Sequence, residues 1–547
     1  MNKKTHVLQI GQKNWKEYMV LQDRENLEWS YFDMWTGTDE EALALIKKRK
    51  GRTFDAVICT DKINWAQIEK FSKVIEAYSL IINQDYEEEI PHDLALKKCP
   101  LFMNTEDKKE EVITTIAQNF FSGQMGSKLH VNTVTVNDDF RGEIEIYGQD
   151  YLQLSGDFSL FSQNALVTWQ HNIGMYGRSK KIWLEFECQG NTEISITLLK
   201  ILEGSSQVIE RHVYTQEEIK RGIEVPYEKN IGYLSLSLTA TGAGALKIGP
   251  LHFRDSRQHY GEYILGGRKI VDERNQELFY YFHPGDLKPP LNVYFSGYRS
   301  AEGFEGFFMM KKLGTPFLLI TDPRLEGGSF YMGSMELERQ LIEIIQRYLQ
   351  ELHFTSDQLI LSGLSMGTYG ALYYASELSP GYVIVGKPLV NIGDIAANEE
   401  LVRPGGFPTS LDILRSLTGK LSEESVEILN QRFWALFEKS DFSNTRFIIS
   451  YMKNDDYDKN AYPNIIMALS DKDSAVIGKG ILGRHNDNSQ AINQWFINQY
   501  HRILVETYGR ERKQDGFWHN LEYFANKFLQ TWCKNCIPPG SYGSLHE

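Results

Sequence analysis

The sequence predicts an α/β fold class divided into three successive domains. Short apolar runs alternate with helical patterns in the first and last parts of the chain, and the hydrophobic period changes to two between them. Strands that alternate with helices are typical of parallel sheets, whereas a period of two is typical of antiparallel sheets with one buried face. We place the three domains at residues 1–125, 126–260 and 261–547.

The first domain has the pattern of a Rossmann-like α/β sheet. Buried strands are predicted at 7–10, 54–59 and 78–82, and a helix over 39–48 follows Thr38, a residue type that caps helices. No G-x-G-x-x-G turn or Walker loop follows any of these strands. We therefore expect a docking domain without a dinucleotide site.

Apolar and polar residues alternate in the middle domain, which predicts an antiparallel β-sandwich. Such sandwiches often bind carbohydrate, so Trp169, His171 and Trp183 could form a platform for a sugar. We favour the alternative that these side chains pack within the protein. The alternating stretches are 144–146, 151–154, 182–188 and 234–239.

Strands and helices alternate again in the third domain. A long amphipathic helix is predicted over 334–352, with an apolar face that packs on the sheet. The strand at 358–362 is followed by a glycine-rich turn and another helix. The other predicted strands are 291–296, 317–320 and 446–452, and the other predicted helices are 489–507 and 520–533.

The glycine-rich turn contains the motif Gly363-Leu364-Ser365-Met366-Gly367. It follows an apolar strand and opens a helix at 368–375, which is the setting of a nucleophile elbow. The two outer glycines leave room for the backbone of a sharp turn, and the serine hydroxyl then projects where the helix dipole favours an anion. This context predicts an α/β-hydrolase-like catalytic domain with Ser365 as its nucleophile.

A serine nucleophile needs a histidine base, which follows it in the chain order Ser, acid, His. His485 lies in a polar, glycine-containing loop before a helix, and we choose it as the base. His519 is the alternative, whereas His501 lies within an amphipathic helix and His546 lies at the end of the sequence.

The acid should follow the strand at 446–452. Asp455 is our choice. Asp456 also lies within reach of that strand end, and Asp458 is a further alternative.

Two backbone N–H groups should form the oxyanion hole of this site. We expect them from Met366, directly after the nucleophile, and from Tyr298 in the Gly297-Tyr298-Arg299 turn. A triad needs no metal, and no metal-binding motif is visible. The Cys533 and Cys536 pair lacks a second Cys/His pair at zinc spacing.

The composition excludes several other classes of protein. The 547 residues are 42% hydrophobic and 24% charged, which is a globular composition. A formal net charge of −14 disfavours binding to nucleic acid, and five cysteines indicate a reducing compartment. Because neither a signal peptide nor a spanning apolar run is visible, we expect a cytoplasmic location.

Three segments together resemble the second accessory secretory protein family of the accessory Sec system, found in streptococci, staphylococci and related Gram-positive bacteria. They are the Gly297-Tyr298-Arg299 turn after its strand, the segment 363–370 around the elbow, and Gly483-Arg484-His485. Many families share the elbow, but its combination with the three-part organisation and the length is more specific. The resemblance spans the whole chain.

The resemblance implies export of serine-rich-repeat glycoprotein adhesins, with other accessory Sec secretion proteins and the accessory Sec motor ATPase as partners. It also implies O-acetylation of N-acetylglucosamine on those adhesins by a Ser-acid-His triad, matched here by Ser365, Asp455 and His485. Some members have Glu as the acid, so Asp is a conservative departure. No bound cofactor is implied, only an acetyl donor such as acetyl-CoA as a substrate. Contact with the inner face of the membrane would be peripheral.

Two other interpretations stay open. The protein could be a non-catalytic structural subunit of the export complex, or it could be a carbohydrate esterase. A Ser365→Ala variant separates an enzyme from a scaffold, and product analysis with a glycan acceptor separates a transferase from an esterase.

Overall fold

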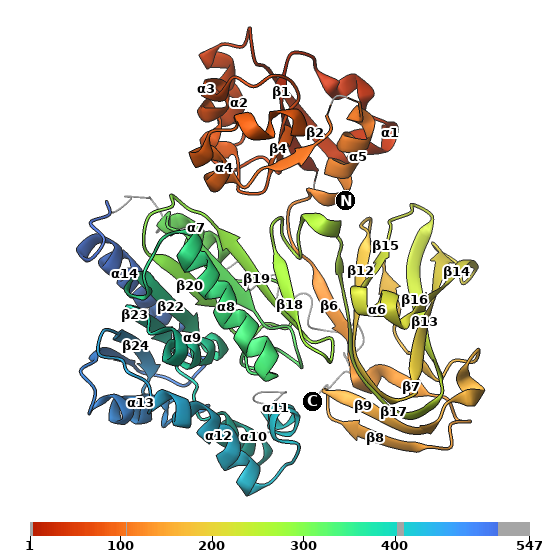
Figure 1. Ribbon diagram of the computed structural model, residues 1–547, viewed down its shortest axis with the longest axis vertical. Coiled ribbons are helices and arrows are strands. Elements are labelled where there is room, and N and C mark those ends of the chain that lie inside the picture. Colours follow the sequence, from red (N-terminus) through yellow and green to blue (C-terminus); the bar gives the residue numbers. More distant parts are fainter. Residues whose placement is uncertain (1–3, 106, 402–409, 512–547) are drawn as a thin grey trace, which may run out of the picture. The chain divides into compact units, whose positions relative to one another are not determined.

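The computed structural model describes residues 4–105, 107–401 and 410–511. Within them the chain forms four β-sheets with accompanying helices (Figure 1). The predicted α/β class is therefore confirmed.

The first sheet is parallel throughout, as its alternating pattern predicts. Thr38 begins α2 (Asp39–Lys48) with a capping box: its Oγ1 accepts from the N–H of Glu41, and the Glu41 carboxylate accepts from the N–H of Thr38. In order across the sheet, the strands are β2 (Leu27–Asp33), β1 (Thr5–Gly11), β3 (Ala56–Cys59), β4 (Leu80–Asn83) and β5 (Leu101–Met103). The other helices are α1 (Leu21–Asn26), α3 (Trp65–Lys70), α4 (His92–Lys98) and α5 (Lys109–Asn119).

Two antiparallel sheets follow, and apolar side chains from both form one buried cluster. One sheet has the order β14 (Val208–Thr215), β13 (Glu193–Leu202), β16 (Ile231–Thr241), β10 (Val167–Trp169) and β7 (Val134–Val136), with β11 (Ile173–Gly174) beside β16. The other has the order β15 (Ile223–Val225), β12 (Lys180–Gly190), β17 (Ala243–Asp255), β9 (Tyr151–Asp157) and β8 (Glu143–Tyr147), with β6 (Gly126–Leu129) beside β17. Helix α6 (Gln216–Arg221) precedes β15.

The candidate sugar platform is not a surface feature of this region. Trp169 and Trp183 are each only 3% exposed, and His171 is exposed. Trp169 belongs to the sandwich core, whereas the indole N–H of Trp183 donates to the Asn275 carbonyl at 2.6 Å. Packing is therefore the use that the structure supports for both tryptophans.

The fourth sheet is antiparallel between its first three strands and parallel from the third strand to the last. Its order is β18 (Arg268–Val271), β19 (Glu277–His283), β21 (Phe317–Thr321), β20 (Leu291–Phe295), β22 (Leu359–Leu364), β23 (Tyr382–Gly386), β24 (Arg446–Met452) and β25 (Ala475–Ile481). Because β20, β22, β23, β24 and β25 run in the same direction, the loops that follow them meet at one edge of the sheet.

The predicted helices that the structure describes in this part begin close to their predicted positions. Ser334 caps α8 (Met335–Glu351) by accepting from the N–H of Leu337. The predicted helix over 520–533 lies outside the described residues. The other predicted helices are α9 (Met366–Leu378) and α14 (Ser489–Glu506), and the structure adds α7 (Phe307–Leu313), α10 (Ile392–Leu401), α11 (Ser410–Thr418), α12 (Glu423–Phe437) and α13 (Ala461–Leu469). No helix of the described residues is both long and apolar enough to cross a membrane.

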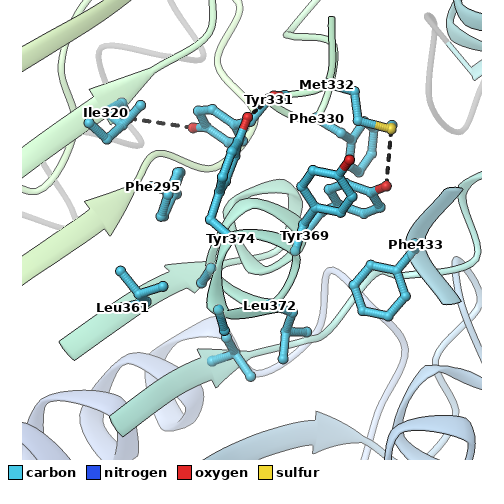
Figure 2. Close-up of a cluster of buried hydrophobic side chains, with 14 of the residues drawn as sticks. Phe295, Ile320, Phe330, Tyr331, Met332, Leu361, Tyr369, Leu372, Tyr374 and Phe433 are labelled. Atoms are coloured by element: carbon cyan, nitrogen blue, oxygen red, sulfur yellow. Dashed lines mark hydrogen bonds between the residues drawn. The ribbon is translucent and has the colours of Figure 1, made fainter. Parts of the chain in front are cut away.

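Helix α9 is held against the sheet by aromatic side chains (Figure 2). The ring of Tyr374 stacks on Phe295 with centroids 5.8 Å apart, and its hydroxyl donates to the Tyr331 carbonyl at 2.8 Å. The Tyr331 hydroxyl donates in turn to the Ser296 carbonyl at 2.5 Å. Since Ser365 directly precedes α9, these contacts fix the elbow relative to the loops that follow β20 and β21.

Candidate active site

Ser365 lies in the sharp turn between β22 and α9, in a conformation that non-glycine residues rarely adopt. Its φ is 53° and its ψ is −122°, and its N–H donates to the Gly386 carbonyl at 2.9 Å. The flanking glycines are required by close approach. A Cβ at Gly363 would lie 2.2 Å from the Gly367 carbonyl oxygen, and one at Gly367 would lie 2.1 Å from the Phe295 carbonyl oxygen. The strand, the turn and the helix thus lie where the motif predicts them.

The structure brings the hydroxyl of Ser365 to the imidazole of His485. Ser365 Oγ is 2.8 Å from His485 Nε2, although the two residues are 120 positions apart. His485 follows β25 and is 2% exposed. Its Nδ1 is 2.9 Å from Oδ2 of Asp455, which follows β24. When Nδ1–H donates to this carboxylate, Nε2 is left to accept from the serine hydroxyl.

The structure gives the three candidate acids different partners. Asp455 faces the imidazole and also accepts from the N–H of Tyr457. Asp456 accepts from the backbone N–H of His485 at 2.9 Å and thereby holds the loop instead of the ring. Asp458 accepts from the N–H groups of residues 390 and 391, and burial raises the pKa of its carboxyl group against the effect of these bonds. Asp455 is therefore the acid in contact with the imidazole ring.

Two further side chains pack around this arrangement. The Tyr457 ring lies beside the His485 ring, with centroids 4.4 Å apart. Burial lowers the pKa of Lys387, and the nearby carboxylates of Asp455 and Asp487 oppose this shift. The Lys387 ammonium donates to Ser489 Oγ at 2.9 Å. Lys387 was not identified from the sequence, because no motif surrounds it.

The two expected oxyanion donors follow neighbouring strands of the sheet. Met366 is the first residue of α9, and Tyr298 lies three residues after the end of β20, which pairs with β22. A Cβ at Gly297 would be only 3.1 Å from the Leu364 carbonyl oxygen, so this turn approaches the elbow closely. The N–H of Gly297 donates to Glu305 Oε2 at 2.8 Å. The Glu305 carboxylate stabilises the turn from eight positions away, and the sequence did not reveal this role.

Of the remaining candidates, the structure describes only His501. His501 lies on α14, and His519, His546, Cys533 and Cys536 lie outside the described residues. Within the described ranges, no group of three or more His, Cys, Asp or Glu side chains is arranged to hold a metal ion.

Comparison with known proteins gives one consistent family. A family model described as "Accessory Sec system GspB-transporter" matches residues 5–510. The chain is 40% identical over 523 residues to the second accessory secretory protein of the accessory Sec system of Staphylococcus aureus, covering 93% of this chain and 98% of that protein. It is 38% identical over 518 residues to the protein of the same name from Streptococcus gordonii, covering 94% and 100%.

One solved structure is similar over nearly the whole chain. It is the "Glycosylation Associate Protein (Gap123) complex from Streptococcus agalactiae", with a TM-score of 0.84 and 36% sequence identity. The match covers 94% of this chain and 100% of that one.

Proposed function

The chain belongs to the family of the second accessory secretory protein of the accessory Sec system, and on this premise we propose that it serves adhesin export in two ways. It is a subunit of a complex of accessory Sec proteins that works with the accessory Sec motor ATPase on serine-rich-repeat glycoproteins. It is also a serine-dependent O-acetyltransferase that acts on N-acetylglucosamine of these glycoproteins. Its site of action is the cytoplasm, with peripheral contact at the inner face of the membrane.

One observation supports the enzymatic part above all others: the continuous hydrogen-bonded series from Ser365 Oγ through His485 to Asp455. His485 Nε2 takes the proton of the serine hydroxyl as Oγ attacks the carbonyl carbon of an acetyl donor such as acetyl-CoA. Asp455 holds the tautomer and stabilises the imidazolium. The N–H groups of Met366 and Tyr298 stabilise the oxyanion. The leaving group then takes the proton from His485, and the acetyl group remains on Ser365.

The second half of the reaction repeats these steps with a sugar. His485 takes the proton of a sugar hydroxyl, whose oxygen attacks the acetyl carbonyl carbon. When the tetrahedral intermediate collapses, Ser365 Oγ leaves and recovers the proton from His485. Transfer exceeds hydrolysis only when the acceptor is positioned better than water, so the site must bind the glycan.

The domain division belongs to the same proposal. We divide the chain at 1–125, 126–260 and 261–547 into a Rossmann-like domain, a β-sandwich that contributes to glycan binding, and an α/β-hydrolase-like domain. Separate buried clusters support this division, because one set lies within 7–120, another within 129–251 and a third within 278–469.

The test is a Ser365→Ala variant expressed in a host that makes the adhesin. We expect acetylation of the adhesin glycan, measured by mass spectrometry, to fall to background, because alanine has no hydroxyl to carry the acetyl intermediate. A Ser470→Ala variant, which changes an exposed serine of the same part of the chain, should acetylate normally. Normal acetylation by Ser365→Ala would contradict the proposal.

The Ser365→Ala variant tests the scaffold alternative, and the wild-type protein tests the esterase alternative. If export of the adhesin continues while acetylation is lost, the protein has separable scaffold and enzyme roles. If the wild-type protein only removes acetyl groups from a purified glycan, it is a carbohydrate esterase.

A further inference from the structure

The loop after β20, residues 296–306, carries Tyr298 beside the elbow. It contains three glycines, and Gly303 and Gly306 have φ angles of 137° and 81°. Glycine-rich backbone has many accessible conformations, so contacts from outside help to select the path of this loop, together with bonds inside it such as that of Glu305 to Gly297. Several of these contacts come from the sandwich and from the segment that leads into it.

The first contacts are hydrogen bonds that the backbone of this loop makes with the backbone of Gly126 and with the side-chain amide of Gln124. The N–H of Glu302 donates to the carbonyl of Gly126, the first residue of β6, at 3.2 Å. The Gln124 side chain accepts from the N–H of Phe304 at 2.9 Å and donates to its carbonyl at 2.6 Å. Gln124 therefore satisfies both backbone groups of Phe304, as a neighbouring strand would.

The second set of contacts surrounds the carboxylate of Glu302. This side chain is 2% exposed and accepts from the Tyr263 hydroxyl at 2.8 Å. Its other oxygen is 2.6 Å from Nδ1 of His252 on β17 and 3.7 Å from the ammonium of Lys128 on β6. A buried carboxylate costs free energy unless it is paired, and both cationic partners here belong to the sandwich.

His252 is itself held from both sides. Its Nε2 is 2.9 Å from the Glu185 carboxylate on β12, so both ring nitrogens face carboxylates. Burial disfavours the imidazolium, but the carboxylates of Glu302 and Glu185 outweigh this effect and raise the pKa of His252 to about 9. The ring is therefore a cation at neutral pH and joins β12 and β17 to the loop.

We propose that the sandwich strands β6 and β17 hold this loop in place beside Ser365, and that Glu302 is the positioning residue through which they act. Glu302 touches no reacting atom. It sets the place of the Tyr298 N–H, and the inference thus rests on the proposed acyl transfer.

A purely structural role predicts a different outcome. If these contacts only joined the sandwich to the sheet, their loss would reduce the amount of folded protein, and each folded molecule would react normally. A positioning role predicts a lower kcat with an unchanged KM, because an oxyanion donor acts mainly in the transition state.

The experiment measures the release of p-nitrophenol from p-nitrophenyl acetate by the full chain. For Glu302→Gln we expect kcat per folded molecule to fall about 10- to 100-fold, since loss of one oxyanion donor costs about 10²–10³-fold and displacement costs less. KM should change less than about twofold. Glu143→Gln, an exposed glutamate on β8, is the matched control and should behave as wild type.

A second variant keeps the test decisive if Glu302→Gln does not fold. Gln124 is exposed, so Gln124→Ala should fold and should lower kcat about 3- to 10-fold through the loss of two bonds to Phe304. If the folded variants keep the wild-type kcat per folded molecule, the positioning role is wrong, whereas the proposed acyl transfer is unaffected. If wild-type protein releases p-nitrophenol no faster than Ser365→Ala, the proposed acyl transfer fails and the positioning role fails with it.

Discussion

Replacing His252 with glutamine should make the stability of the protein depend on pH differently from that of the wild type. The imidazole is 2% exposed and lies between the carboxylates of Glu185 and Glu302, and the ammonium of Lys128 lies 3.7 Å from the Glu302 carboxylate. Glutamine has a similar length and can still donate a hydrogen bond, but it cannot carry a proton. The substitution therefore removes the charge without creating a large cavity.

The size of the effect follows from the pKa of His252 in the folded and unfolded states. It is about 9 in the folded protein and about 6.5 in an unfolded chain. Because the folded pKa is the higher, the stabilisation is fully present below pH 6.5 and is lost as the pH rises through about 9. The difference corresponds to about 3 kcal/mol of free energy of unfolding.

The assay is urea denaturation followed by tryptophan fluorescence at pH 6.0 and pH 9.5. The free energy of unfolding of the wild type minus that of His252→Gln is the quantity of interest. This difference should be about 3 kcal/mol larger at pH 6.0 than at pH 9.5. His171→Gln, which removes an exposed imidazole from the same sandwich, is the control and should follow the wild type. A difference between wild type and His252→Gln that is equal at both pH values would refute the reasoning.

Three other substitutions, two of them with a matched control variant, test the site and the fold. Asp455→Asn should lower turnover of p-nitrophenyl acetate about 10³- to 10⁴-fold through the wrong imidazole tautomer. Asp456→Asn keeps an oxygen for the backbone N–H it holds and should cost less than about tenfold, so equal losses would argue against our assignment. Glu277→Gln should reduce the free energy of unfolding by about 3–5 kcal/mol in urea, because its buried carboxylate pairs with two cations. The substitution leaves the Lys269 ammonium without this partner and leaves the Arg254 guanidinium with Glu262 alone. The exposed Glu336→Gln should cause no measurable change. Gly367→Ala should cost about 3 kcal/mol or more, because its methyl group would meet a backbone carbonyl at 2.1 Å, and a melting temperature within about 1 °C of wild type would contradict this.

Elements set by a few neighbouring residues could be predicted from the sequence. Thr38 and Ser334 begin helices because their hydroxyls accept from backbone N–H groups three positions later. The elbow around Ser365 is equally local, since glycines two positions to either side permit the turn. The period of two over β12 and β16 likewise indicates which residues face the sandwich core.

The partners of polar side chains could not be predicted in the same way. Trp183 and Glu185 lie on the face of β12 that points away from the sandwich core, where the alternating pattern predicts exposed side chains. Both are nevertheless buried. Residues 275 and 276 cover them. The indole N–H of Trp183 donates a hydrogen bond to the Asn275 carbonyl, and the side-chain amide of Gln276 donates one to the Glu185 carboxylate. A strand pattern shows which face a residue is on but not what covers that face.

The sequence by itself determined the α/β class and the strand–turn–helix setting of Ser365, because both depend on local backbone geometry. It also limited the candidate acids to three carboxylates, because all three follow the same strand. Only the tertiary structure decided that Asp455 meets the His485 ring while Asp456 binds the backbone of the same residue. It also decided that Glu302 is tied to the sandwich. Consecutive carboxylates differ in partner through side-chain direction and through contacts with residues many positions away, and neither is encoded in the order of neighbouring residue types.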